Sequence, residues 1–256
     1  MIEIKELYKK FGKNQVLNGL SLDVQDGETI VILGRSGVGK SVLLKHLLGI
    51  TKPDSGSVKI DGVEVTNLSG AELYFAIREM GMLFQGAALF DSMNIEENVG
   101  FHLTQHGDRE TGEPFTKEEI LERVNEALKM VDLEDVNLKM PSELSGGMRK
   151  RAGLARLIAY RPKILLYDEP TTGLDPTTAM QINRLIRKTQ KELNATSIVV
   201  THDIVSAYVI GDRFALHQEG KILYHDTPEK FLEIDDNLIK SLKSLLPADL
   251  SSLREI

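Results

Sequence analysis

The chain has 256 residues, of which 41% are apolar and 27% charged, an ordinary balance for a globular protein long enough to bury a substantial core. Its formal net charge of −7 argues against a nucleic-acid partner, because such proteins usually carry a basic excess. The absence of cysteine excludes disulfides, thiolate zinc sites and iron–sulfur ligation by this chain.

Neither a leader nor a membrane span is predicted. The opening residues 1–6 are charged, which is not typical of a signal peptide. No apolar run approaches the roughly 18 residues that a membrane helix needs. We therefore expect a chain that is soluble by itself, with any membrane part supplied by a partner.

Residues 1–62 predict strands and one helix. Apolar residues alternate with polar ones in 2–7 and again in 20–24, as in a half-buried strand. The continuous apolar run 29–33 is typical of a buried strand of a parallel sheet. Glycines follow it, and then 41–48 predicts a helix. Residues 58–62 predict a hairpin turn.

The middle of the chain changes character. A second buried strand is expected at 82–84. Residues 86–150 are helix-rich and polar, and within them Thr116 and Glu119 form a capping box that predicts a helix to about Val131. We interpret 86–150 as an inserted helical subdomain.

Strands and helices alternate again in the second half. Buried strands are predicted at 163–168 and 197–201. Between them, Asp175 and Pro176 form an N-cap followed by proline, which predicts a helix to about Leu193. A hairpin (213–218 and 221–224), a helix from 227 and an amphipathic tail from 235 follow. Such alternation favours an α/β fold with a parallel sheet covered on both faces, in which ligands bind beyond the carboxyl ends of the strands.

A glycine-rich segment after the first buried strand fits the phosphate-binding loop pattern. It reads Gly34-Arg35-Ser36-Gly37-Val38-Gly39-Lys40-Ser41. Its backbone N–H groups can surround phosphate oxygens, Lys40 can reach the β- and γ-phosphates, and Ser41 can ligate Mg²⁺. A plain glycine turn is the alternative, which the strand before it and the helix after it disfavour.

Two acids end the strand at 163–168, on the same side of the sheet as this loop. Asp168 is expected to hold Mg²⁺ through its water shell, and Glu169 to orient or deprotonate the attacking water. In isolation such a pair is often a solvated turn.

A second anion site is predicted at Leu144-Ser145-Gly146-Gly147-Met148. Ser145 is a good N-cap, and the glycine N–H groups and the helix dipole favour an anion there. One nucleotide needs only one phosphate loop, so the second site requires an explanation.

These segments, with Tyr167-Asp168-Glu169-Pro170, Gly173-Leu174-Asp175 and Thr201-His202-Asp203, occur in an order that closely resembles the ABC ATPases over residues 1 to about 230. The Ser-Gly-Gly motif separates that family from other phosphate-loop NTPases. In the family it contacts the γ-phosphate of ATP held by the opposite subunit. The resemblance therefore implies a head-to-tail dimer that hydrolyses ATP at two shared sites.

The resemblance also implies a fold and its division. The fold is a P-loop NTPase (RecA-like) core with an antiparallel β subdomain and an inserted α-helical subdomain. The whole chain, 1–256, is expected to be one nucleotide-binding domain. Its parts are 1–85 and 151–234 (core with β subdomain), 86–150 (helical subdomain) and 235–256 (C-terminal extension).

Further roles follow from the resemblance. Gln85 is expected to sense Mg²⁺ or water, His202 to lie at the γ-phosphate, and Phe11 to stack on adenine, with Tyr8 as the alternative. The expected catalytic residues are Lys40, Gln85, Glu169 and His202, and the Mg²⁺ ligands are Ser41, Gln85 and Asp168. The expected ATP-binding residues are Phe11, Gly34, Arg35, Ser36, Gly37, Val38, Gly39, Lys40, Ser41, Val42, Ser145, Gly146, Gly147 and Asp175.

Two residues depart from the family pattern. Met148 stands where most transporter members carry glutamine, and Val42 where a threonine hydroxyl is common. Neither position supplies the lysine, the Mg²⁺ ligands or the general base.

Met148 and the stretch from Gly86 to Phe90 look like the ATPases of bacterial MCE-type lipid-transport complexes, including the maintenance-of-lipid-asymmetry system. Residues 86–90 either line a groove for a helix of a membrane subunit or only pack the helical subdomain. The implied partners are a second copy, a membrane permease, a lipid-binding MCE protein and an accessory subunit, with no nucleic acid. The implied location is the cytoplasmic face of the inner membrane.

Two alternatives remain open. One is the ATPase of a small-solute importer, against which the context of Met148 counts. The other is a soluble ABC protein of DNA repair or iron–sulfur assembly, although DNA-repair members carry long coiled-coil insertions or cysteine-ligated zinc, and this acidic chain has neither.

Overall fold

The computed structural model describes residues 1–35, 37–108, 111–250 and 253. Within them a six-stranded sheet has the order β10-β9-β3-β8-β7-β6. Neighbouring strands run parallel except β10, which pairs antiparallel with β9 at the edge. The strands are β3 (Thr29–Leu33), β6 (Met80–Leu83), β7 (Ile164–Asp168), β8 (Thr196–Thr201), β9 (Arg213–Gln218) and β10 (Lys221–Asp226).

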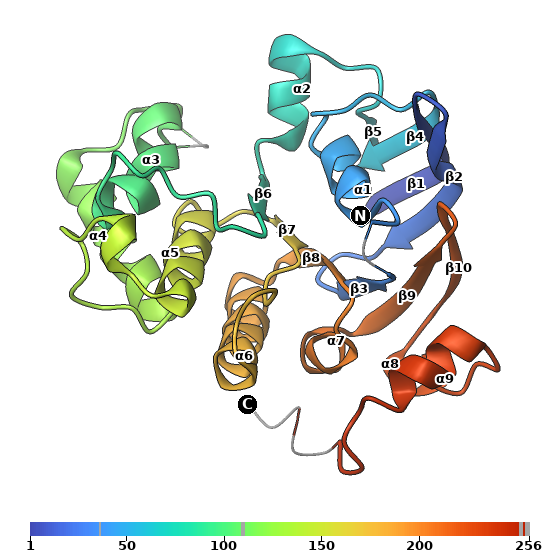
Figure 1. Ribbon diagram of the computed structural model, residues 1–256. Helices are drawn as coiled ribbons and strands as arrows, with labels where there is room; N and C mark the ends of the chain where they lie inside the picture. The colour runs from blue at the N-terminus through green and yellow to red at the C-terminus, as the bar shows by residue number, and fades with distance from the viewer. Residues whose placement is uncertain (36, 109–110, 251–252, 254–256) are drawn as a thin grey trace.

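A second, antiparallel sheet of four strands lies beside the first, in the order β2-β1-β4-β5 (Figure 1). Its strands are β1 (Ile2–Phe11), β2 (Asn14–Val24), β4 (Ser55–Ile60) and β5 (Val63–Glu64). Strand β2 begins six residues before the alternation that predicted it, because residues 14–18 pair with the far end of β1.

Alternate residues of the parallel sheet pack into two different cores, as the period of a strand requires. Val31 and Leu33 of β3 belong to a core with α5, α6 and α7 (Ile204–Ile210). Ile30 and Ile32 belong to a core with α1 (Lys40–Leu47) and the antiparallel sheet. Both faces of the sheet are therefore covered, and the predicted α/β fold is confirmed.

The helices after β6 gather on one side of the molecule, away from the antiparallel sheet (Figure 1). They are α3 (Ile95–His106), α4 (Lys117–Met130), the 3-10 turn η1 (Pro141–Glu143) and α5 (Gly146–Ile158). The capping box of Thr116 and Glu119 forms as predicted. The boundary expected at residue 150 falls inside α5, a single continuous helix; the division of the chain into subdomains stays a prediction.

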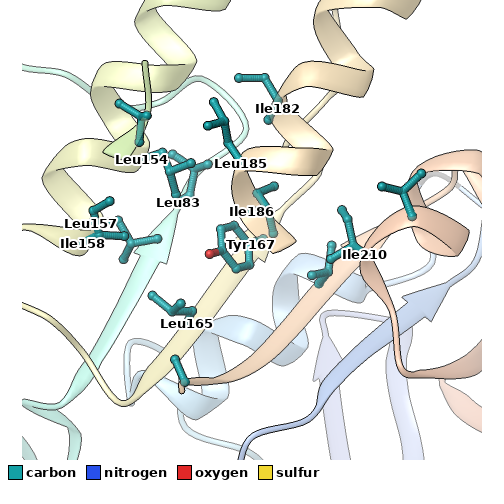
Figure 2. Packing of buried hydrophobic residues seen from close by; sticks show 14 of the residues in the cluster. Leu83, Leu154, Leu157, Ile158, Leu165, Tyr167, Ile182, Leu185, Ile186 and Ile210 are labelled. Atoms are coloured by element: carbon teal, nitrogen blue, oxygen red, sulfur yellow. The ribbon is translucent and has the colours of Figure 1, made fainter. Parts of the chain in front are cut away.

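Helix α5 is anchored to the parallel sheet by its apolar side. Figure 2 shows Leu154 and Leu157 of α5 near Leu83 of β6, with Tyr167 of β7 between them and Ile186 of α6. Helix α6 (Pro176–Leu193) has the predicted bounds, and Asp175 caps it by accepting hydrogen bonds from the N–H groups of residues 177 and 178. The starts of α5 and α6 are thereby fixed relative to the sheet.

Other elements differ from the sequence-based expectations or were absent from them. Phe84 lies outside β6 and is exposed, because the chain leaves the sheet there. Helices α2 (Gly70–Ile77) and α7 were not predicted. The helix expected from 227 is α8 (Pro228–Phe231), and the tail from 235 contains α9 (Asn237–Lys243). No helix in the described part of the chain is both long and apolar enough to cross a bilayer.

Candidate functional site

The parallel strands β3, β7 and β8 end at one edge of the sheet, and a cleft of about 310 Å³ lies there. The cleft brings together residues from the glycine loop, the acidic pair, the segment after β6 and the segment after β8. It is lined by Val16, Gly37, Gly39, Lys40, Ser41, Val42, Gln85, Glu169, Thr172 and His202. Asp168 lies beneath it, nine-tenths buried.

Lys40 begins α1 and is held by the loop that precedes it. Its Nζ donates to the carbonyl oxygens of Gly34, at 2.7 Å, and Arg35, at 2.9 Å. Gly39 must be glycine because its φ is +104° and an added Cβ would lie 2.5 Å from a Val16 methyl carbon. Burial lowers the pKa of the Lys40 ammonium, and the charge of Glu169 opposes that shift.

The carboxylate of Glu169 lies at the centre of the cleft's hydrogen bonds. Its Oε1 is 3.4 Å from Lys40 Nζ, and its Oε2 is 2.9 Å from His202 Nδ1. Oε2 also accepts from the hydroxyls of Thr172, at 3.2 Å, and Thr201, at 3.3 Å. Glu169 has φ +46°, a left-handed conformation uncommon outside glycine, directly after the last residue of β7. The structure thus joins the predicted lysine, acid and histidine in one network.

The oxygen ligands expected for Mg²⁺ are adjacent. Ser41 Oγ donates to Asp168 Oδ1 at 2.7 Å, and Gln85 lines the same cleft. A hydroxyl, one carboxylate and an amide oxygen suit Mg²⁺, which takes oxygen ligands and keeps several waters and substrate phosphates in its shell. Among the described residues, no group of three or more His, Cys, Asp or Glu could hold a metal ion. The residues present fit a metal that the nucleotide helps to bind.

A second cleft, of about 810 Å³, surrounds the Ser-Gly-Gly turn. Ser145 caps α5 by accepting a hydrogen bond from the N–H of Met148, at 3.3 Å. Asp175 lines the same cleft, as do Gly146 and Gly147. No lining residue is shared with the first cleft. The two predicted anion sites are therefore separate within one copy of the chain.

The other residues predicted to contact ATP do not all line these two clefts. Phe11 ends β1 and is 49% exposed, with Lys9 Nζ 5.4 Å from its ring centroid. It is not among the described residues that line either cleft, and Tyr8, the alternative, donates to Glu6 at 3.3 Å. Gly34 lies close to the backbone of β9, Val38 and Arg35 line a neighbouring groove, and Ser36 lies outside the described residues.

The sequence analysis did not single out Lys150 as a functional residue. The structure buries this lysine at 6% exposure, and its Nζ donates to the carbonyl oxygen of Gln85. Its spacing to Gly153, Leu154 and Leu157 could have indicated that it is buried. Residues three, four and seven positions apart share one helix face, and these three residues are buried.

Comparisons with known proteins agree on one family. Residues 17–172 match the family model described as ABC transporter. The chain is 42% identical over 250 residues to the methionine import ATP-binding protein MetN of Clostridium tetani, covering 96% of this chain and 76% of that one. It is 38% identical over 239 residues to the probable ribonucleotide transport ATP-binding protein mkl of Mycobacterium leprae, covering 93% and 67%.

Solved structures show the same relationship. The dimeric structure of MJ0796, a bacterial ABC transporter cassette, has a TM-score of 0.80 and 34% identity, covering 89% of this chain and 98% of that one. A post-hydrolysis state of the same cassette, dimeric and bound to ADP and Pi, has a TM-score of 0.79 with equal identity and coverage. The chain therefore belongs to the ABC transporter family, as an ATPase subunit that uses ATP and Mg²⁺.

Proposed function

We propose that the first cleft is where this chain hydrolyses ATP, with Glu169 as the general base. The observation that carries this assignment is the network that joins Glu169 to Lys40 and His202 directly above the Ser41–Asp168 pair. A carboxylate at a strand end, next to a phosphate-binding loop, is placed to orient or deprotonate water.

Each residue of the cleft then has one task. Lys40 neutralises charge on the β- and γ-phosphates, and His202 donates to the transferring phosphoryl group. Glu169 accepts a proton from the attacking water. Ser41, Asp168 and Gln85 would hold Mg²⁺, which when bound would neutralise charge on the phosphate oxygens. Lys40 must leave Glu169 for the phosphates, which frees the carboxylate for the water.

Adenine recognition by Phe11 is part of the same proposal. An aromatic ring that is half exposed at the end of a strand offers a stacking face to a base without specific hydrogen bonds. Gly34, Arg35, Ser36, Gly37, Val38, Gly39 and Val42 are proposed to wrap the phosphates.

We propose further that two copies pair head to tail, so that the Ser145 cleft of one copy covers the nucleotide in the first cleft of the other. The separation of the two clefts within a chain supports this arrangement, since Ser145, Gly146, Gly147 and Asp175 line the second cleft and none of them lines the first. The MJ0796 cassette is dimeric.

Sharing of sites predicts complementation between two inactive variants. A Lys40→Ala copy cannot supply the lysine half of a composite site but keeps the Ser145 half. A Ser145→Arg copy cannot supply the Ser145 half but keeps the lysine half. A mixed dimer contains one intact composite site, so we expect an ATPase rate above that of either homodimer and at most about half of the normal rate per dimer. Differently tagged copies purified by tandem affinity give the mixed dimer, and phosphate release measures the rate.

The two homodimers, prepared in the same way, are the controls and should show only background rates. A verified mixed dimer that recovers no activity would contradict the shared site.

We propose that the chain powers transport of phospholipid through a membrane permease, as in MCE-type systems, with an MCE lipid-binding protein and an accessory subunit. Met148 and the segment 86–90 support this branch. The chain would then act at the cytoplasmic face of the inner membrane, held there by the permease. The relatives' names give methionine, iron(III) and ribonucleotide as cargo, so a small-solute importer is the second candidate.

The segment 86–90 both packs inward and leaves a surface for a partner. Leu89 is half-buried against the main core, whereas Phe90 is 41% exposed and its ring lies 4.8 Å from that of Phe101. A groove for a permease helix therefore remains part of the proposal, with Phe90 as its apolar contact.

Purification from native membranes distinguishes a lipid transporter from a small-solute importer and from a soluble ABC protein. A tagged chain extracted in detergent is expected to bring down a permease, an MCE-domain protein and phospholipid, which mass spectrometry identifies. An untagged strain processed in parallel is the control. Recovery of a solute-binding protein in place of the MCE protein would favour the importer, and recovery of soluble partners or DNA alone would contradict transport.

A further inference from the structure

Helix α5 holds the segment after β6 by three main-chain carbonyl groups. Lys150 Nζ donates to the oxygen of Gln85, and Arg156 donates to the oxygens of Ala87, at 2.9 Å, and Ala88, at 2.8 Å. Ala87 and Ala88 have φ of +63° and +50°, two consecutive left-handed residues. Such backbone is costly for alanine and persists where surrounding contacts fix it. The turn that carries Gln85 is thus fastened to α5.

The charges of the acidic pair also act on Lys150. Burial lowers the pKa of its ammonium, while the charges of Asp168 and Glu169 raise it. Lys150 Nζ donates to a carbonyl of Gln85, which carries no net charge. Lys150 is only 6% exposed, and burying a charged ammonium costs free energy unless an opposite charge lies near. The two carboxylates supply charge of that sign.

The same helix begins at the other cleft. Ser145 caps α5, and Lys150 follows five residues later, about 7.5 Å along the helix axis. Residues 150–158 of α5 are packed against the sheet, as Leu154 and Leu157 show in Figure 2. A rigid helix therefore connects the turn proposed to face the partner's nucleotide with the Gln85 carbonyl.

We propose that Lys150 is a positioning residue that couples the two clefts of one chain: it links the occupancy of the Ser145 cleft to the placement of Gln85. When nucleotide binds at the N-terminus of α5 and the helix shifts, the Lys150 ammonium and the Gln85 carbonyl move together. This inference rests on the proposed roles of the two clefts.

A role in packing alone predicts something different. Gly153 of α5 lies against the same turn, where an added Cβ would come within 2.9 Å of Ala87 Cβ. This contact and the two bonds of Arg156 seat the turn without Lys150. Lys150→Met keeps most of the side-chain volume, so it should leave the fold in place and remove only the hydrogen bond and the charge.

The test compares Lys150→Met and Lys150→Arg with wild type in the purified full-length chain. We measure kcat, KM for ATP, the Hill coefficient and the melting temperature. Lys150→Met is expected to lower kcat about ten- to hundred-fold, the effect of losing one charge-assisted hydrogen bond. KM should stay within about threefold, and the Hill coefficient should fall toward 1. Lys150→Arg should restore most of both.

Lys163→Met is the matched control, because the Lys163 side chain is 73% exposed and pairs with Glu79 outside the cleft. It should behave as wild type. Should Lys150→Met not fold, Lys150→Gln replaces it, since glutamine can donate to the carbonyl but carries no charge. If the folded variant keeps the wild-type kcat and Hill coefficient, the inference is overturned. It is also overturned if kcat and the melting temperature fall and KM rises together, and Lys150→Arg restores none of them.

Glu169→Gln in the same assay separates the two levels of the proposal. If it slows turnover as expected while Lys150→Met keeps the wild-type kcat and Hill coefficient, the coupling role alone fails. If Glu169→Gln keeps normal turnover, the assignment of the hydrolysis cleft fails, and the coupling role with it.

Discussion

Glu169→Gln is expected to slow ATP turnover by roughly 10²–10⁴-fold, the usual contribution of a general base, while ATP still binds. The amide has nearly the shape of the carboxylate and can keep a hydrogen bond to Thr172 or Thr201, but it cannot take a proton from water. It also removes the anion that pairs with Lys40 at 3.4 Å, so the lysine is free for phosphate. Single-turnover hydrolysis and equilibrium binding of a fluorescent ATP analogue separate the two effects.

Glu122→Gln provides the control for this change. Glu122 is an exposed glutamate of α4, outside both clefts, so its variant should hydrolyse ATP at the normal rate. Near-normal turnover in Glu169→Gln would remove Glu169 from the role of general base.

Lys40→Ala is expected to weaken ATP binding about ten- to hundred-fold or more, because charge-assisted hydrogen bonds to phosphate are lost. In the structure the ammonium is already buried at the floor of the cleft, 5% exposed, among the carbonyl oxygens of Gly34 and Arg35. Alanine leaves these oxygens and Glu169 to repel the nucleotide. Equilibrium titration with ATP and Mg²⁺ measures the loss.

Lys45→Ala is the matched control, since Lys45 lies on the same helix with an exposed side chain. Melting temperatures of both variants are compared, because Lys40 also ties the loop to Glu169 and its removal can loosen the fold. Unchanged ATP affinity in folded Lys40→Ala protein would refute the assignment of the phosphate-binding loop.

Much of the fold could be predicted because its signals are local. The buried strands β3, β7 and β8 each contain at least three consecutive apolar residues, a pattern typical of strands covered on both faces. Helix α6 carries its own N-cap, Asp175, and a proline at its first position, which fixed its start. Short elements with no such signal, α2 and α7, were missed, since tertiary packing rather than propensity stabilises them.

The candidate site divides in the same way. The amino-acid sequence by itself determined that Lys40, Ser41, Asp168, Glu169 and His202 would meet, because all follow strands whose carboxyl ends lie at one edge of a parallel sheet. It did not determine that Lys150 is buried beside Gln85, nor that α5 runs unbroken through residue 150. Those facts depend on contacts between segments 65 residues apart, and only the packing of α5 on β6 and β7 decided them.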